Sequence, residues 1–463
     1  MLTYQDLLKV IDDPKRKMDF VYDLIQNHKG SPRYNDAVIA DEYARNLNRT
    51  IIQYQKLLYT ISGKAVPDNY SANYKIVSNY FDLFISMENQ YLLGNGVTWE
   101  NESTKEALGK DFDTRLQECG YEALSGGVSF GFWNFDHLEC LSIRDFADLY
   151  DEENGALMAG AKFWQIDGTK PLRATFYEID GYTDYMWTSE DGDMKGQILR
   201  EKRPYKTVKT GTPADDMYIY KGENYDGFPI VPLWGNKHKQ SELVGRRSAI
   251  DAYDLIKSGF ANDIDDTSQI YWLIENASGM DEIDVAKFMN RIKRQHVALT
   301  DDEVHVDARR VEVPVQSREA LLDRLRADLF EAFMVVDIKN IADGAVTATQ
   351  IDAAYKPMNI KVDKYEYCVI DFLQGILKIA GIDDNPTFTR SGVNNKAEDI
   401  TSLLQGSQEL PSEYVTKKLV TILGDADQLN DIMKMKEKED EERLERSPLM
   451  PLQGEEQTNE EEE

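Results

Sequence analysis

The chain has 463 residues, of which 41% are hydrophobic, and it carries a formal net charge of −30 at pH 7. This length predicts about three domains with sizeable cores, and no apolar run reaches the roughly 18 to 20 residues of a membrane-spanning helix. So acidic a surface repels nucleic-acid phosphates, which argues against tight DNA binding but not against handling DNA without holding it.

The sequence lacks the residue patterns on which many enzymes rely. Its three cysteines and five histidines form no disulfide framework, CxxC pair or HExxH motif. It also has no GxxxxGK[ST] phosphate loop, no GxGxxG at a strand–helix junction and no GxSxG elbow. The N-terminus has acids among its apolar residues and no small-residue cleavage site, so it is not a signal peptide. We therefore expect a soluble intracellular protein that needs no cofactor.

The first 235 residues divide into a helical part and a β-rich part. Residues 1–62 predict two or three helices, and residues 71–96 predict another with an apolar stripe. Residues 126–235 contain short strand-like stretches rich in aromatic residues. Turn signals at Asn154–Gly155 and Asp180–Gly181 predict two hairpins there.

The next hundred residues predict two long helices around a small insert. Residues 241–275 form a helical run with Ser241 as a possible N-cap, and residues 317–336 are helical again. Between them, residues 277–316 predict a short helix and two strand-like stretches. This order predicts a stalk with a knob at its tip.

A single long helix follows a loop in which Gly344 can adopt positive φ. The helix is expected over residues 347–380, with a capping box from Thr347 to Gln350, a kink at Pro357 and Gly381 after its end. Such a helix is typical of an element that reaches another surface, and an ordinary core helix is the alternative. Three helical segments and an acidic tail, expected to be disordered from Ser447 onward, complete the chain.

One acidic cluster could carry metal-dependent chemistry. Asp263, Asp265 and Asp266 could bind Mg²⁺ for phosphodiester hydrolysis. On a helix, however, Asp263 and Asp265 point about 200° apart, and no further ligand or base is identifiable. A solvated acidic face is the alternative.

One basic cluster stands out against the acidic whole. It lies in the insert, on the short helix and the strand-like stretch after it, and comprises Lys287, Arg291, Lys293, Arg294, Arg309 and Arg310. It could be a docking surface for a protein or a nucleic acid, or simply a solvent-exposed helix face.

Several segments, in this order and spacing, resemble a known family. They are ANYKIVSNYFDLFISMENQYLLGNGV, FPIVPLWGNKHKQSELVGRRSAIDAYDLIKSGFANDI, VEVPVQSREALLDRLRADLFE, GAVTATQIDAAYKPMNIKVDKYEY and PSEYVTKKLVTILGDADQLNDIMKMKEKEDEE. Across roughly residues 70 to 440 the chain resembles the portal proteins of long-tailed, siphovirus-type bacteriophages, in the branch typical of Gram-positive hosts.

The resemblance implies an α+β portal fold whose parts map onto the predicted segments. These are a wing (1–235), two stem helices (241–275 and 317–336), a clip (277–316), a tunnel loop (337–346), a tunnel helix (347–381), a helical crown (382–437) and an acidic tail (438–463). The first 60 or so residues match least well.

The resemblance also implies a function. About twelve copies would form a ring at one capsid vertex of the virion, assembled in the host cytoplasm, through which double-stranded DNA passes without sequence specificity. The implied partners are the terminase large subunit, docked on the clip at Lys287, Arg291, Lys293 and Arg294, the head–tail adaptor, and the capsid and scaffolding proteins. No membrane and no metal are implied.

Two sets of residues are expected to line the channel. In the tunnel loop they are Asp337, Ile338, Lys339, Asn340, Asp343 and Gly344, where Lys339 would contact phosphates transiently or pair with a neighbouring acid. On the first stem helix they are the acids Asp251, Asp254, Asp263, Asp265 and Asp266. A metal-dependent nuclease or hydrolase that uses the acidic cluster remains the alternative function.

Overall fold

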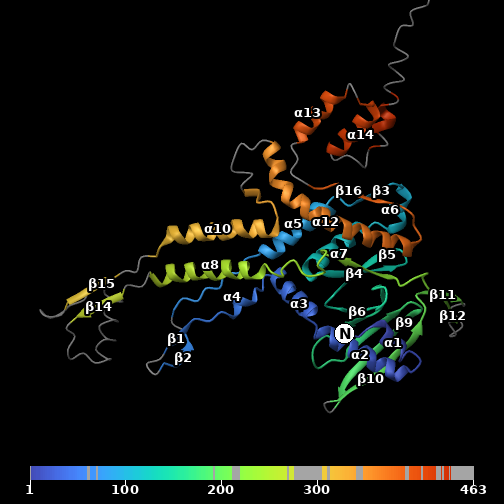
Figure 1. The fold of residues 1–463 in the computed structure, drawn as a ribbon, viewed down its shortest axis with the longest axis horizontal. Coiled ribbons are helices and arrows are strands. Elements are labelled where there is room, and N and C mark those ends of the chain that lie inside the picture. The colour runs from blue at the N-terminus through green and yellow to red at the C-terminus, as the bar shows by residue number, and fades with distance from the viewer. Residues whose placement is uncertain are drawn as a thin grey trace, which may run out of the picture. The chain divides into compact units, whose positions relative to one another are not determined.

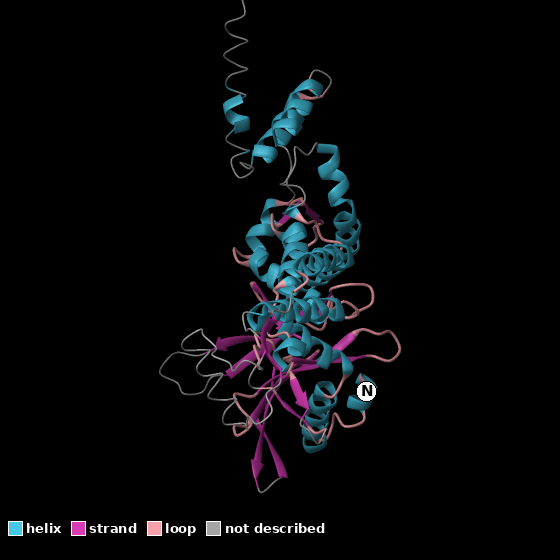
Figure 2. Ribbon diagram, turned by 90° about the vertical axis from the view of Figure 1, so that its left-hand side faces the viewer, coloured by secondary structure: helices cyan, strands magenta, loops and turns pink. Residues whose placement is uncertain are grey.

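The structure, a computed structural model, describes residues 2–59, 63–68, 71–190, 193–210, 219–267, 271–275, 305–309, 313–339, 348–391, 396–407, 410–423, 429, 432–436 and 438 (Figure 1). The chain forms two compact units. The larger consists of Met1–Gly344 and Ala353–Ser391, and the smaller of Ala345–Asp352 and Gly392–Glu463. Helices and strands are mixed throughout the larger unit, as expected for the α+β class (Figure 2).

Four helices open the chain, where two or three were predicted: α1 (Tyr4–Leu8), α2 (Pro14–Lys29), α3 (Pro32–Ala44) and α4 (Arg49–Gln53). The start of α2 is fixed by Asp13, whose carboxylate accepts the amides of Lys15 and Arg16. Ser31 caps α3 in the same way by accepting the Tyr34 amide. Both helices carry proline at their first position, where the missing amide costs nothing.

The β-rich region consists mainly of two antiparallel sheets. The five-stranded sheet has the order β10-β9-β8-β7-β6 and consists of β6 (Phe146–Tyr150), β7 (Leu157–Trp164), β8 (Leu172–Glu178), β9 (Gly181–Glu190) and β10 (Asp193–Arg203). The three-stranded sheet has the order β13-β4-β5 and consists of β4 (Val128–Asn134), β5 (His137–Ser142) and β13 (Ile230–Trp234). Both predicted hairpins are confirmed, with Gly155 and Gly181 at positive φ in their turns.

Two hydrophobic cores hold these sheets. In the smaller core, α1 and α2 pack their apolar side chains onto the five-stranded sheet. The larger core joins the three-stranded sheet to α5 (Tyr80–Leu93), α7 (Phe112–Gly126) and the long helix α12 (Ala348–Ala380). Gly131 of β4 is required there because a Cβ atom at that position would lie 2.4 Å from the Phe372 ring of α12.

The larger unit also contains the helix α6 (Glu102–Leu108) and, among its described residues, four two-stranded sheets, one of which is described with the stalk helices below. The other three pair β1 (Leu57–Tyr59) with β2 (Ala65–Pro67), β3 (Val97–Trp99) with β16 (Pro386–Phe388), and β11 (Lys206–Thr210) with β12 (Ile219–Glu223).

The two predicted stalk helices are α8 (Arg247–Thr267) and α10 (Val315–Phe333), and they pack against each other (Figure 1). The predicted boundaries of the first are wrong at both ends. Ser241 does not cap it but accepts the Leu243 amide in a preceding turn. Residues predicted as its last turns form the strand β14 (Tyr271–Glu275), which pairs with β15 (His305–Arg309). Aromatic and β-branched residues in YWLIE favour this strand.

The long helix α12 follows the prediction closely, from Ala348 to Ala380 through Pro357. Gly381 ends it at positive φ, and the Ile382 amide donates to the Leu377 carbonyl, as in a Schellman motif. The predicted kink stays a prediction, and Thr347 lies outside the described residues. In the smaller unit, α13 (Lys396–Gly406) and α14 (Ser412–Leu423) match two of the three predicted helical segments.

Candidate functional site

The pair α8 and α10 is joined by charge and by aromatic packing. Arg318 of α10 forms an ion pair with Asp263 of α8 and lies over the Phe260 ring. At the other end of α10, Phe330 and Phe333 are buried against Phe84 of α5, with ring centroids 4.9 and 4.6 Å from it. The pair is therefore fixed to the core of the larger unit at one end, while β14 and β15 lie at the other (Figure 1).

Three polar side chains of α8, at positions i, i+4 and i+8, hold an extended segment, residues 74–78, along the helix. We call this segment the strap. Each side chain accepts one backbone amide of the strap: Tyr74 N donates to Asn262 Oδ1 at 2.6 Å, Ile76 N to Ser258 Oγ at 3.0 Å, and Ser78 N to Asp254 Oδ1 at 3.0 Å. The spacing fits because four helical residues rise about 6 Å and two extended residues about 6.6 Å.

This ladder corrects the expected role of one acid. Asp254 is fully buried and also accepts the Asn48 amide group at 2.5 Å, and burial raises the pKa of its carboxyl. The prediction that Asp254 faces the channel is therefore wrong. Asp251 accepts the hydroxyl groups of Tyr43 and Thr50 but is partly exposed, and for it a position in the channel stays a prediction.

The two remaining acids of α8 whose side chains are described, Asp263 and Asp265, are not part of a metal site of the kind that the nuclease alternative requires. Asp263 is paired with Arg318, Asp265 is exposed, and the side chain of Asp266 lies outside the described residues. No group of three or more His, Cys, Asp or Glu side chains in the described part of the chain is arranged to hold a metal ion. For Asp263, Asp265 and Asp266 a position in the channel stays a prediction.

The loop between α10 and α12 is described only at its beginning. Met334 ends α10 in the left-handed conformation. The Asp337 carboxylate lies 2.8 Å from Arg326 and accepts the Lys339 amide at 3.1 Å, while Ile338 and Lys339 are exposed. Asp337 is thus held by α10. Asn340, Asp343 and Gly344 lie outside the described residues, as do the clip residues Lys287, Arg291, Lys293 and Arg294.

A buried charge cluster near the middle of α12 was not predicted. Lys361 of α12 forms ion pairs with Glu88 of α5 and, at 3.0 Å, with Glu242. Arg246 binds the Glu242 side chain at 2.8 Å and the Ala332 carbonyl of α10 at 2.9 Å. The sequence did carry a signal, since Glu88 and Lys361 are charged residues on otherwise apolar helix faces.

Burial has opposite outcomes for the two carboxyls of this cluster. Burial and the nearby Glu242 raise the pKa of Glu88 to about 7, although the attraction of Lys361 opposes the rise. For Glu242, burial also opposes ionisation, but Lys361 and Arg246 outweigh it and hold its pKa below the ordinary value. The cluster therefore keeps Glu242 ionised and leaves Glu88 close to neutralisation at physiological pH.

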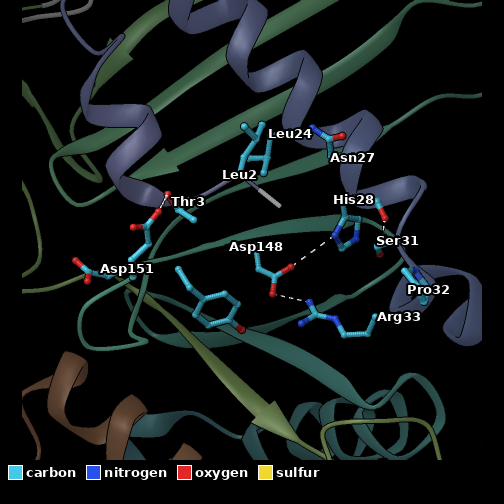
Figure 3. A pocket seen from close by; sticks show the side chains of 12 residues that line it. Leu2, Thr3, Leu24, Asn27, His28, Ser31, Pro32, Arg33, Asp148 and Asp151 are labelled. Atoms are coloured by element: carbon cyan, nitrogen blue, oxygen red, sulfur yellow. Dashed lines mark hydrogen bonds and ion pairs between the residues drawn. The ribbon is translucent and has the colours of Figure 1, made fainter.

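A cavity of about 350 Å³ lies between α2, the start of α3 and β6 (Figure 3). His28 and Arg33 flank the Asp148 carboxylate, at 3.6 Å from its Oδ1 and 2.5 Å from its Oδ2. Burial lowers the pKa of His28, and its Nε2 lies 2.7 Å from the Ile143 carbonyl. These side chains bind one another and so support the fold between α2, α3 and β6.

The comparison with protein families decides the identity. The family model described as "Phage portal protein, SPP1 Gp6-like" matches residues 40–442. The chain belongs to this family of phage portal proteins. The resemblance inferred from the sequence is thereby confirmed, and the metal-dependent nuclease receives no support.

Individual relatives are distant. The chain is 21% identical over 386 residues to the portal protein of Clostridium phage phiCD119, covering 75% of this chain and 81% of that protein. It is 23% identical over 387 residues to the portal protein of Bacillus phage SPP1, covering 76% and 74%. A chain from the neck of an empty gene transfer agent particle superposes with a TM-score of 0.44 at 10% identity, covering 74% of this chain and 90% of that one. No helix among the described residues is long and apolar enough to cross a membrane.

Proposed function

We propose that about twelve copies of this portal protein form a ring at one capsid vertex of a phage virion, and that double-stranded DNA enters and leaves through its channel. The family match over residues 40–442 carries this proposal. The ring assembles in the host cytoplasm and does no covalent chemistry of its own. The parts of the chain keep the roles set out above, with α8 and α10 as the stem and α12 as the tunnel helix.

The exposure of the two stem helices supports α10 as the helix that lines the channel. One side of α8 is covered by the strap and another by α10, whereas α10 exposes four acids, which are spread over about half of its circumference: Glu319, Asp323, Asp328 and Glu331. Asp328 is paired with Arg324. Repeated around a ring, the exposed acids repel DNA phosphates, so that DNA slides rather than binds.

The tunnel loop adds the opposite charge. Lys339 is exposed and is the one basic residue in the sequence of the loop, residues 337–346. The neighbouring Asp337 carboxylate is paired with Arg326 of α10. One Lys–phosphate contact per subunit, lost and remade as DNA moves, is a weak and salt-sensitive interaction. Lys339→Ala lowers packaging yield or retention of packaged DNA while rings still form. The neighbouring Ile338→Ala serves as the control, and unchanged packaging across a range of salt concentrations refutes the role of Lys339.

The partners follow from the same proposal. The clip, with its basic residues Lys287, Arg291, Lys293 and Arg294, docks the terminase large subunit and later the head–tail adaptor. Capsid and scaffolding proteins are further partners of the ring. Reversal of Arg291 and Arg294 to Glu leaves rings intact but impairs packaging or tail joining, and normal packaging and joining in that variant refutes the clip assignment.

Imaging and particle mass test the proposed function directly. The purified full chain, viewed by negative-stain electron microscopy, gives rings, and mass photometry gives particles near 640 kDa, twelve times the 53.0 kDa chain. A monomer that cleaves DNA in the presence of Mg²⁺ overturns the proposal.

A further inference from the structure

The C-terminal half of α12 is tightly anchored in the larger core. Its buried side chains include Val369, Phe372 and Ile376. Phe372 fills the space that a side chain at Gly131 would need, and Val231 packs closely on Gly375, where a Cβ atom would lie 2.8 Å from it. Packing this close leaves no room for the helix to shift without strain.

The middle of α12 combines apolar packing with polar contacts, since Met358 and Val362 are buried in the same core. Lys361 is paired with Glu88 and Glu242. One turn later, the Tyr365 hydroxyl and the Asn89 Oδ1 are buried and find no hydrogen-bond partner among the described residues. Both line the space beside Gly120, at 2.6 and 2.3 Å from where its Cβ would be. Each unsatisfied buried group costs about 1–3 kcal/mol. Lys361 shares the polar attachment of this segment with Asn359, which accepts the Tyr91 hydroxyl at 2.6 Å, and with Asp363, which pairs with Arg390 at 2.5 Å.

The charge cluster contacts both α10 and α12, the helices that precede and follow the tunnel loop in the sequence. Upstream of the loop, the Arg246 side chain donates a hydrogen bond to the Ala332 carbonyl, five residues before Asp337. Downstream, Lys361 lies on α12 beyond Pro357. Glu242 binds Arg246 and Lys361 together, at 2.8 and 3.0 Å. One carboxylate thus connects the helix that enters the loop with the helix that leaves it.

We propose that Lys361 is a positioning residue that fixes the N-terminal half of the tunnel helix to the end of the stem through one buried charge cluster. Only the names of the stem and the tunnel helix rest on the proposed function. Because Lys361 contacts two buried carboxylates, moving this half of α12 breaks at least one ion pair in a setting where an unpaired charge is costly. The apolar C-terminal half acts as the fixed end.

Hydrogen exchange along α12 in the full chain tests this role. Lys361→Met keeps the length of the side chain and removes its charge. Amides at 350–360 then exchange at least about tenfold faster, while those at 369–380 keep their rates, because local opening is separate from global unfolding. Lys364→Met, a neutral replacement of an exposed lysine on the same helix, leaves both sets unchanged, and Lys361→Arg keeps the slow exchange.

The outcomes separate this proposal from its alternatives. A uniform increase along α12 means that Lys361 stabilises the fold without positioning the helix, and unchanged rates mean that it does neither; both overturn the proposal. If Lys361→Met does not fold, the double variant with Glu88→Gln removes one charge of each sign and gives the same readout. Exchange is measured whether or not rings form, so failure of ring assembly counts against the proposed function alone.

Discussion

Replacing Glu88 with glutamine should remove a specific pH dependence of stability. Glu88 is 2% exposed, and burial, with the repulsion of Glu242, raises its pKa from 4.5 to about 7. The folded chain therefore binds this proton more tightly than the unfolded chain does. Between pH 4.5 and 7 the folded state gains stability as the pH falls, and it loses that stability as the pH rises through 7.

The size of the effect follows from the two pKa values. They differ by about 2.5 units, and each unit corresponds to about 1.4 kcal/mol, which gives roughly 3 kcal/mol over the whole range, most of it between pH 5 and 8. Glu88→Gln cannot titrate. Its free energy of unfolding relative to the wild type should therefore rise by up to about 3 kcal/mol between pH 5 and pH 8.

Urea denaturation of both proteins at several pH values measures this difference. The wild-type curve alone is not sufficient, because burial lowers the pKa of His28 and makes the folded state more stable as the pH rises toward the ordinary pKa of His, near 6.5. Subtracting the wild-type free energy of unfolding from that of Glu88→Gln at each pH removes the contribution of His28, which is the same in both proteins. A difference that stays constant from pH 5 to 8 would show that Glu88 is ionised throughout, and would refute the cause assigned to its raised pKa.

Two further predictions concern the surface and the core. Leu57 is 52% exposed on the two-stranded β1–β2 sheet, and a sheet of two strands is only marginally stable on its own. We expect this sheet to pack against a neighbouring subunit of the ring, so Leu57→Asp should reduce ring formation in mass photometry, whereas Ile166→Asp, at an 85% exposed site, should not. Equal assembly of the two variants would exclude Leu57 from the contact between subunits. Gly131→Ala should lower the free energy of unfolding by about 1–3 kcal/mol, because the new Cβ would meet Phe372 at 2.4 Å. Gly168→Ala, with open space around the residue, should change the free energy of unfolding by less than about 0.5 kcal/mol. Similar changes in the two variants would contradict the packing argument.

Local signals in the sequence were enough to predict several elements. The apolar spacing of α12 and Gly381 after it gave the helix nearly to the residue, because both signals act within a few residues of where they stand. The β14 strand was mistaken for helix, since its pairing partner β15 begins thirty residues later at His305. A short apolar run fits either structure until a partner is known.

The direction of a polar side chain on a helix is harder to predict than the helix itself. Asp254, Ser258 and Asn262 share one face of α8, and periodicity alone makes that face look solvated. Their partners are backbone amides of residues 74–78, about 180 residues away in sequence. Every buried backbone amide needs an acceptor, but the side chains of an extended segment do not show in the sequence which residues will supply those acceptors. The acids of α8 were therefore expected in a channel, although one of them is a buried hydrogen-bond acceptor.

The net charge of −30 thus has two separate consequences that the composition does not distinguish. Acids such as Glu88, Glu242 and Asp254 are buried and connect helices, so they contribute to the position of the stem and of α12. Acids such as Glu319, Asp323 and Glu331 are exposed on α10, where they make the electrostatic potential at the surface of this helix negative. Substitution of the first group should change where α12 lies without altering the field along α10, and substitution of the second should do the reverse. The charge along α10 and the position of α12 therefore depend on different acids, and a substitution can change one while the other is preserved.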